Sequence, residues 1–348
     1  MKRNILTIIL LAIVVDAFFF DFTLRLFPIA NSKMILAVIG IFAFVYKGIQ
    51  DHKVQLSSRV FVSGLLALVF SLWCYFSIVM NGSNEREFVT YFVSFATWVG
   101  GAYGAYAILK TKYKRVDLTL ITYYLALVCV SQCIIALLID NIPAVRNLVN
   151  STFSMATDFY ERGGRLYGIA CALDPAGIRF AAVLVLIAHQ LSVDDRVRRD
   201  SGKSTFFILS FLVITIIGSM ISRTTIIGTA LGLAFILISN LRMRRGGIVS
   251  KVQVNASLLL IFLIGGAVII SAILYNTNSV FREDLRFGFE GFFNWVETGE
   301  FRTGSTDHLQ TMWYGRQPDR DGSSERDAWV YSKPTRISVT ATTSSIAD

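Results

Sequence analysis

Nine long apolar runs, separated by short clusters of charged residues, are the feature that most restricts how this chain can fold. A helix needs roughly 20 apolar residues to cross about 30 Å of bilayer hydrocarbon, and the runs reach or approach that length. They cover residues 5–27, 33–49, 59–80, 88–109, 118–139, 176–193, 205–221, 223–241 and 254–275. Charged residues make up only 16% of the chain, against about 25% in a soluble globular domain. We therefore predict an all-α fold, a polytopic transmembrane bundle of nine spans, and exclude an ordinary soluble enzyme.

The basic residues between the runs predict the orientation of this bundle. Lys and Arg accumulate in the cytoplasmic loops of membrane proteins. With a cytoplasmic N-terminus, the inner segments carry 17 basic residues, and the outer loops carry six: Lys33, Arg86, Arg146, Arg162, Arg165 and Arg223. This orientation places the 140–175 loop, and a late polar segment after residue 275, on the extracytoplasmic side.

The placement of cations and of metal-binding side chains excludes two other classes. A nucleic-acid-binding protein gathers Lys and Arg on one face, whereas here they alternate between loops. The three histidines, His52, His189 and His308, are far apart and have no Cys/His spacing typical of zinc sites. We therefore expect no bound metal and no nucleic-acid partner.

Ionisable residues in or beside the first run are candidates for function because charge is costly in a bilayer. Asp16 falls near the middle of the run, so it must face the bundle interior or a water-filled cavity. Asp21 and Arg25 are four residues apart, which in a helix allows a local ion pair; Arg25 can also extend to the membrane surface.

Three arginines at the predicted outer face form a second group of candidates. Arg165 ends the 140–175 loop, Arg179 lies in the first turn of the sixth span, and Arg223 occupies the tight turn between the seventh and eighth spans. If they converge, their guanidinium groups suit a phosphate or pyrophosphate, which they bind through paired hydrogen bonds. The alternative is that they reach lipid headgroups or pair with Asp174 and Glu161.

Short motifs around these arginines resemble those of a known family. Arg165-Leu-Tyr-Gly168, the downstream Asp174-Pro-Ala-Gly177, and Ser222-Arg223 between paired spans are similar to motifs of the O-antigen polymerase and O-antigen ligase superfamily. The resemblance covers roughly residues 1–313. It implies a multi-pass glycosyltransferase of the bacterial inner membrane that polymerises or ligates undecaprenyl-diphosphate-linked glycan units for surface polysaccharide at the periplasmic face, with no cofactor.

The resemblance also implies roles for individual residues. Arg165 and Arg223 correspond to binders of the lipid diphosphate, with Arg179 as an addition, and His308 is either the general base or an ordinary loop residue. The implied partners are the lipid-linked glycan, membrane lipids, and the flippase and chain-length regulator of a polysaccharide assembly system. A transporter or flippase of lipid-linked or anionic glycans, and a non-catalytic partner in such an assembly, are the alternatives.

The domain organisation follows from the change in composition along the chain. We predict a transmembrane bundle over 1–275, the start of a late periplasmic loop over 276–313, and a polar tail over 314–348. Residues 315–348 contain no Leu or Phe, and 10 of them are Ser or Thr, so we expect no packed core there. The family continues with further spans at this point, so we interpret the tail as an aberrant end of a longer gene, which would leave this chain inactive.

Two pairs of glycines with GxxxG spacing lie within the runs, at Gly100 and Gly104 and at Gly228 and Gly232. This spacing allows two helices to approach closely. We interpret both pairs as helix-packing sites.

Overall fold

The computed structural model describes residues 5–52, 56–82, 86–154 and 166–245, and part of the stretch 275–306. It divides into two compact units, Met1–Phe293 and Asn294–Asp348. The described residues are mostly helical, and among them only isolated β-bridges occur. The prediction of an all-α fold is therefore confirmed for the described part of the chain. The tail over 314–348 lies outside it.

Apart from the first, the long helices begin and end close to the boundaries of the apolar runs. Asn31 and Asp117 accept hydrogen bonds from backbone N–H groups at the starts of two helices, as N-cap residues do. The elements are α1 (Ile5–Phe19), α2 (Ser32–Gln50), α3 (Ser58–Asn81), η1 (Glu87–Thr90), α4 (Tyr91–Lys112), α5 (Leu118–Asn141), α6 (Pro143–Thr152), α8 (Leu173–Val193), α9 (Asp195–Arg199), α10 (Ser201–Ile221), α11 (Thr224–Arg245) and α14 (Glu290–Thr298).

Six of the described helical segments are long and apolar enough to cross a bilayer. They are α2, α3, η1 with α4, α5, α8 and α10, whereas α1 and the apolar part of α11, Thr224–Ser239, are shorter. The ninth run, 254–275, lies almost entirely outside the described residues. The chain is thus a multi-pass, membrane-embedded helical protein. Nine spans were predicted, and six helices that could span a membrane are found among the described residues.

The first span is shorter than the sequence predicts. α1 ends at Phe19, and residues 20–31 form an irregular segment instead of the continuation to residue 27. This segment is held by backbone contacts: Thr23 bridges to Asn31, and Leu24 bridges to Phe153. Because Asp21 and Arg25 lie beyond the helix, the expectation that they stand one helical turn apart is wrong.

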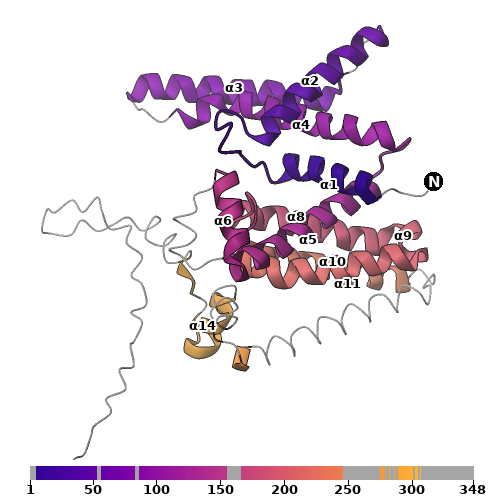
Figure 1. Cartoon of the computed structure of the whole chain (residues 1–348), viewed down its shortest axis with the longest axis vertical. Helices are drawn as coiled ribbons and strands as arrows, with labels where there is room; N and C mark the ends of the chain where they lie inside the picture. The colour runs from indigo at the N-terminus through magenta and orange to yellow at the C-terminus, as the bar shows by residue number, and fades with distance from the viewer. Residues whose placement is uncertain are drawn as a thin grey trace, which may run out of the picture. The chain divides into compact units, whose positions relative to one another are not determined.

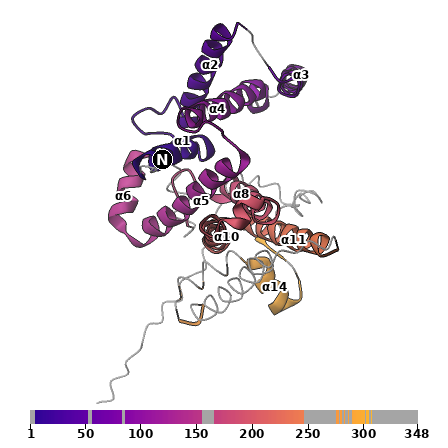
Figure 2. The same ribbon diagram turned by 90° about the vertical axis from the view of Figure 1, so that its right-hand side faces the viewer.

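Within the first unit, α1 connects two groups of helices. It contacts α2 and α4 on one side and α5 on the other, and α5, α8, α10 and α11 pack against one another. Figures 1 and 2 show α2, α3 and α4 grouped on one side of α1 and the larger group on the other.

The two glycine pairs lie where helices pack most closely. A Cβ at Gly40 of α2 would overlap the carbonyl oxygen of Gly100, and one at Gly104 would overlap that of Leu36. A Cβ at Gly228 of α11 would overlap the backbone of Ala181 in α8. The interpretation of both GxxxG pairs as helix-packing sites is therefore confirmed.

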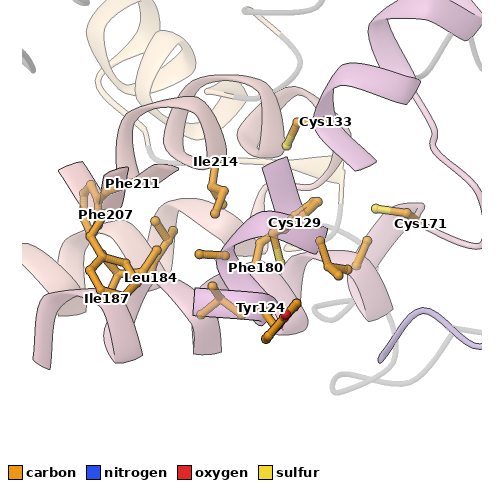
Figure 3. Packing of buried hydrophobic residues seen from close by; sticks show 14 of the residues in the cluster. Tyr124, Cys129, Cys133, Cys171, Phe180, Leu184, Ile187, Phe207, Phe211 and Ile214 are labelled. Carbon is orange, nitrogen blue, oxygen red and sulfur yellow. The ribbon is translucent and has the colours of Figure 1, made fainter. Parts of the chain in front are cut away.

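The buried core lies among α5, α8 and α10, with α1 and α11 at its edges. Figure 3 shows its centre, in which Tyr124, Cys129, Phe180, Leu184 and Ile214 are in close proximity. In contrast, α2 and α3 expose large apolar side chains, such as Phe42 (72% exposed) and Trp73 (70% exposed). Apolar exposure on this scale is characteristic of surface that contacts lipid rather than water.

Candidate functional site

Several segments far apart in sequence meet at one end of the bundle, which we call the α6 end. Here the 20–31 segment contacts the end of α6 through Leu24 and Phe153, and the start of α8 packs against the turn between α10 and α11. Figure 1 shows α6 at this end of the larger helix group and α9 at the opposite end. The α6 end therefore contains both Arg179 and Arg223.

The central feature of the α6 end is an ion triad formed by Asp21, Lys33 and Arg179. The same carboxylate oxygen, Oδ1 of Asp21, lies 3.1 Å from Nζ of Lys33 and 2.7 Å from a terminal guanidinium nitrogen of Arg179. The three residues come from the segment after α1, from α2 and from α8. The triad thus links the two groups of helices that α1 connects.

One aromatic ring packs against each cation of the triad. Nζ of Lys33 lies 4.0 Å from the centre of the Trp98 ring, and the Arg179 guanidinium lies 5.4 Å from the centre of the Phe20 ring. The Lys33 side chain is only 5% exposed. Desolvation strengthens both the cation–π contacts and the ion pairs, since fewer waters compete with them.

A second polar network lies beside the triad and is built around Gln132 of α5. Its amide nitrogen donates to Asp16 over 2.9 Å, and its amide oxygen accepts from the backbone N–H of Ile169 over 2.9 Å. Gln132 is fully buried. Of the two predicted surroundings of Asp16, the bundle interior and a water-filled cavity, the contact with Gln132 supports the interior. Asp16 lies in the last turn of the shortened α1 rather than near the middle of a span.

This network fixes the segment that follows Arg165. Leu166 and Tyr167 are buried, and a Cβ at Gly168 would lie 2.6 Å from the Gln132 amide oxygen, so glycine is required at this approach. Burial raises the pKa of the Cys171 thiol well above its usual value, which keeps the thiol protonated. Arg165 itself lies outside the described residues.

Arg223 occupies the turn between α10 and α11, as the sequence predicts. Its guanidinium lies 2.5 Å from a carboxylate oxygen of Glu290, the first residue of α14. The hydroxyl of Thr224 donates to Asp174 over 3.2 Å. Arg179 pairs with Asp21. The alternative that the arginines pair with Asp174 and Glu161 stays a prediction, because Glu161 and Arg165 lie outside the described residues.

The sequence-predicted site is therefore assembled in part. Arg179 and Arg223 share the α6 end, whereas Arg165 and His308 lie outside the described residues. Lys33 and Gln132 were not selected as functional residues from the sequence. Gln132 carried the signal that could have identified it, because an amide within a long apolar run requires partners inside the bundle.

The opposite, α9 end carries the segments predicted to be cytoplasmic. Arg196 lies 3.2 Å from Asp117, so the 113–118 and 194–200 segments meet there. Partial burial alone would raise the pKa of Asp194, but hydrogen bonds from Thr119 and from the Arg196 backbone, together with the Arg196 charge, lower it below its usual value. The contacts are those of a structural cluster.

Comparison with protein-family models, with curated proteins and with solved structures gave no match. In the part of the chain that the structure describes, no group of three or more His, Cys, Asp or Glu side chains is arranged to hold a metal ion. The geometry of the α6 end is therefore the basis for assigning a function.

Proposed function

We propose that this protein is a membrane glycosyltransferase that polymerises, or ligates, undecaprenyl-diphosphate-linked oligosaccharide units for surface polysaccharide. The observation that carries the proposal is that Arg179 of α8 and Arg223 of the α10–α11 turn lie at the same end of a membrane-embedded bundle, where Gly177 of α8 packs against Ser222. Guanidinium groups held in this way at a bilayer boundary suit a lipid-linked diphosphate. The resemblance of the Arg165, Asp174 and Ser222 motifs to O-antigen polymerases and ligases supports the same chemistry.

In the proposed orientation, the α6 end faces the periplasm and the α9 end faces the cytoplasm of the bacterial inner membrane. The pairing of Asp117 with Arg196 supports this orientation, because it brings together two of the segments rich in basic residues. The excess of basic residues predicts that these segments remain on the cytoplasmic side.

The proposed reaction is a displacement at the anomeric carbon of the donor glycan. A hydroxyl oxygen of the acceptor forms the new bond to this carbon as the bond to the diphosphate oxygen breaks, and the electron pair leaves with the diphosphate. The arginines stabilise the negative charge that develops on the leaving group. A general base, proposed as His308, takes the proton of the acceptor hydroxyl.

The test is the surface-glycan profile of a strain that carries Arg223→Ala in the full-length protein. We expect single-unit chains if the protein is a polymerase, or lipid-linked chains that are not joined to core if it is a ligase, because removing the guanidinium weakens stabilisation of the leaving diphosphate. Arg223→Lys keeps the charge but not the paired hydrogen bonds, so it should retain partial activity. The control is Arg86→Ala, which alters an exposed arginine next to η1 and should leave chain length normal. Chains of normal length that are joined to core as in the wild type, with Arg223→Ala in place, would refute the proposed role.

Transport is the second candidate function, and the irregular 20–31 segment is the observation that favours it. Transporters bind substrates where spanning helices are interrupted, and here α1 stops at Phe19 beside Asp16 and Asp21. A deletion strain separates the candidates. Single-unit chains on the surface indicate a polymerase, lipid-linked chains never joined to core indicate a ligase, and lipid-linked units retained in the cytoplasm indicate a flippase.

A further inference from the structure

We propose that Asp21 is an internal counter-ion that holds the place of a phosphoryl oxygen between Lys33 and Arg179, and that the diphosphate of the donor replaces it there. This inference rests on the proposed function, because the proposed function is what identifies the ligand as a lipid-linked diphosphate. It adds Lys33 to the diphosphate-binding residues and gives Asp21 a regulatory role, because the carboxylate and the substrate compete for the same two cations.

The shared oxygen of Asp21 is the geometric basis of this proposal. Two cations from different helices contact a single oxygen at 2.7 and 3.1 Å, which are distances of charge-assisted hydrogen bonds. A phosphoryl oxygen can occupy the same position with the same contacts. A diphosphate diester also carries two negative charges, whereas one carboxylate carries a single charge, so the exchange improves the charge balance around the two cations.

Lys33 is a buried residue, and the start of the helix that carries it is fixed by a hydrogen bond. The preceding residue, Ser32, donates its hydroxyl to the carbonyl of Ala17 over 2.6 Å, which fixes the start of α2 against α1. The Lys33 side chain is almost fully buried against Trp98. An unpaired ammonium in such surroundings is strongly unfavourable, so Lys33 requires an anion at all times, either Asp21 or a ligand.

Asp21 is placed so that it can withdraw. It lies in the irregular segment after α1, where a change of its backbone or side chain disrupts no helical hydrogen bonds, and its side chain is 24% exposed. The other nearby carboxylate, Asp16, is held by Gln132. Asp21 is therefore the carboxylate that a ligand would displace.

The experiment measures binding of inorganic pyrophosphate to the purified, full-length chain in detergent. Asp21→Asn keeps the size of the side chain and removes the competing charge, so we expect roughly tenfold tighter binding. Lys33→Gln should weaken binding by a similar factor while Asp21 still pairs with Arg179. The double variant should not regain the affinity of Asp21→Asn. Asp194→Asn, at the α9 end, is the matched control and should leave binding unchanged.

Two further arms identify the source of the phosphate groups. Undecaprenyl diphosphate should compete with pyrophosphate in the wild-type chain, whereas vesicles of phosphatidylglycerol should not; the reverse result would assign the site to lipid headgroups and overturn the donor assignment. If Asp21→Asn fails to fold, Lys33→Gln decides the matter, because unchanged binding in that variant contradicts the proposal.

These results are separable from the test of the proposed function. If pyrophosphate binding changes in Asp21→Asn and Lys33→Gln as expected, while the Arg223→Ala strain has a normal surface-glycan profile, the anion site stands and the proposed glycosyltransferase function is refuted. Loss of chain length in Arg223→Ala with pyrophosphate binding that ignores Asp21 and Lys33 would overturn only the present inference.

Discussion

Replacing Gln132 by Leu should destabilise the protein more than a comparable change elsewhere in the bundle. The substitution preserves approximate size but removes both hydrogen bonds of the side chain, leaving Asp16 and the N–H of Ile169 without the partner that each has at 2.9 Å. A buried polar group left unsatisfied costs roughly 1–3 kcal/mol. Two groups lose their partner here. The expected loss is therefore about 1 kcal/mol if each bond contributes the roughly 0.6 kcal/mol average of membrane helices, and up to about 6 kcal/mol if both groups stay unsatisfied, with most of it from the carboxylate.

Gln190 provides a matched control for this prediction. It is as deeply buried as Gln132, but its amide oxygen accepts a weaker, 3.2 Å hydrogen bond from Thr119, whose hydroxyl also lies 2.6 Å from Asp194. Thr119 therefore retains a partner in Gln190→Leu, and we expect a loss below about 1 kcal/mol.

The assay is reversible unfolding of both variants in mixed detergent micelles, followed by circular dichroism. A second measurement, limited proteolysis of the 166–172 segment, should show faster cleavage in Gln132→Leu only, because Gln132 fixes that segment. Equal losses of stability in the two variants would show that the Asp16–Gln132–Ile169 network contributes no more than ordinary burial, and would refute the reasoning.

Two remaining predictions concern helix packing and pH. Gly40→Ala places a Cβ onto the carbonyl oxygen of Gly100 and should lower the free energy of unfolding by about 1–3 kcal/mol. The control is Gly64→Ala, whose Cβ meets only a ring atom at 3.4 Å and which should unfold like the wild type. Similar losses in the two variants would contradict the close packing of α2 against α4. The lowered pKa of Asp194 means that its contribution to stability is present above the unfolded-state value of 3.8 and is lost as the pH falls through the folded-state value. Asp194→Asn should therefore melt below the wild type at pH 7 and approach it towards pH 3, and a constant difference in melting temperature would argue against the lowered pKa.

The sequence could predict the side of the membrane on which each candidate arginine lies, but not the residues with which it pairs. Arg179 and Arg223 were expected on one face because each lies at the end of an apolar run, and alternation of spans assigns ends to sides. The structure places both at the α6 end. The partner of Arg179 was not predictable in this way, because Asp21 is 158 residues away in sequence, and nothing in the local pattern distinguishes it from Asp174.

The residue at which α1 ends could not be predicted from the sequence either. Residues 20–27 are mostly apolar, so their hydropathy predicted a helix that continues to residue 27. The tertiary structure instead provides backbone partners outside the helix, such as the carbonyl of Thr152 for the N–H of Arg25. Once those hydrogen bonds are satisfied elsewhere, the helical ones are not needed.

The sequence by itself determined that this protein is a bundle of apolar helices, since the length and composition of each run leave few other structures that satisfy the backbone in a bilayer. It also determined the sites of close helix contact at Gly100 and Gly228. Only the tertiary structure decided which charges meet: Lys33 and Arg179 share one oxygen of Asp21 because α2, α8 and the 20–31 segment converge in space. Hydrophobic patterning is local and repeats along the chain, whereas an ion triad depends on three segments whose proximity no single segment encodes.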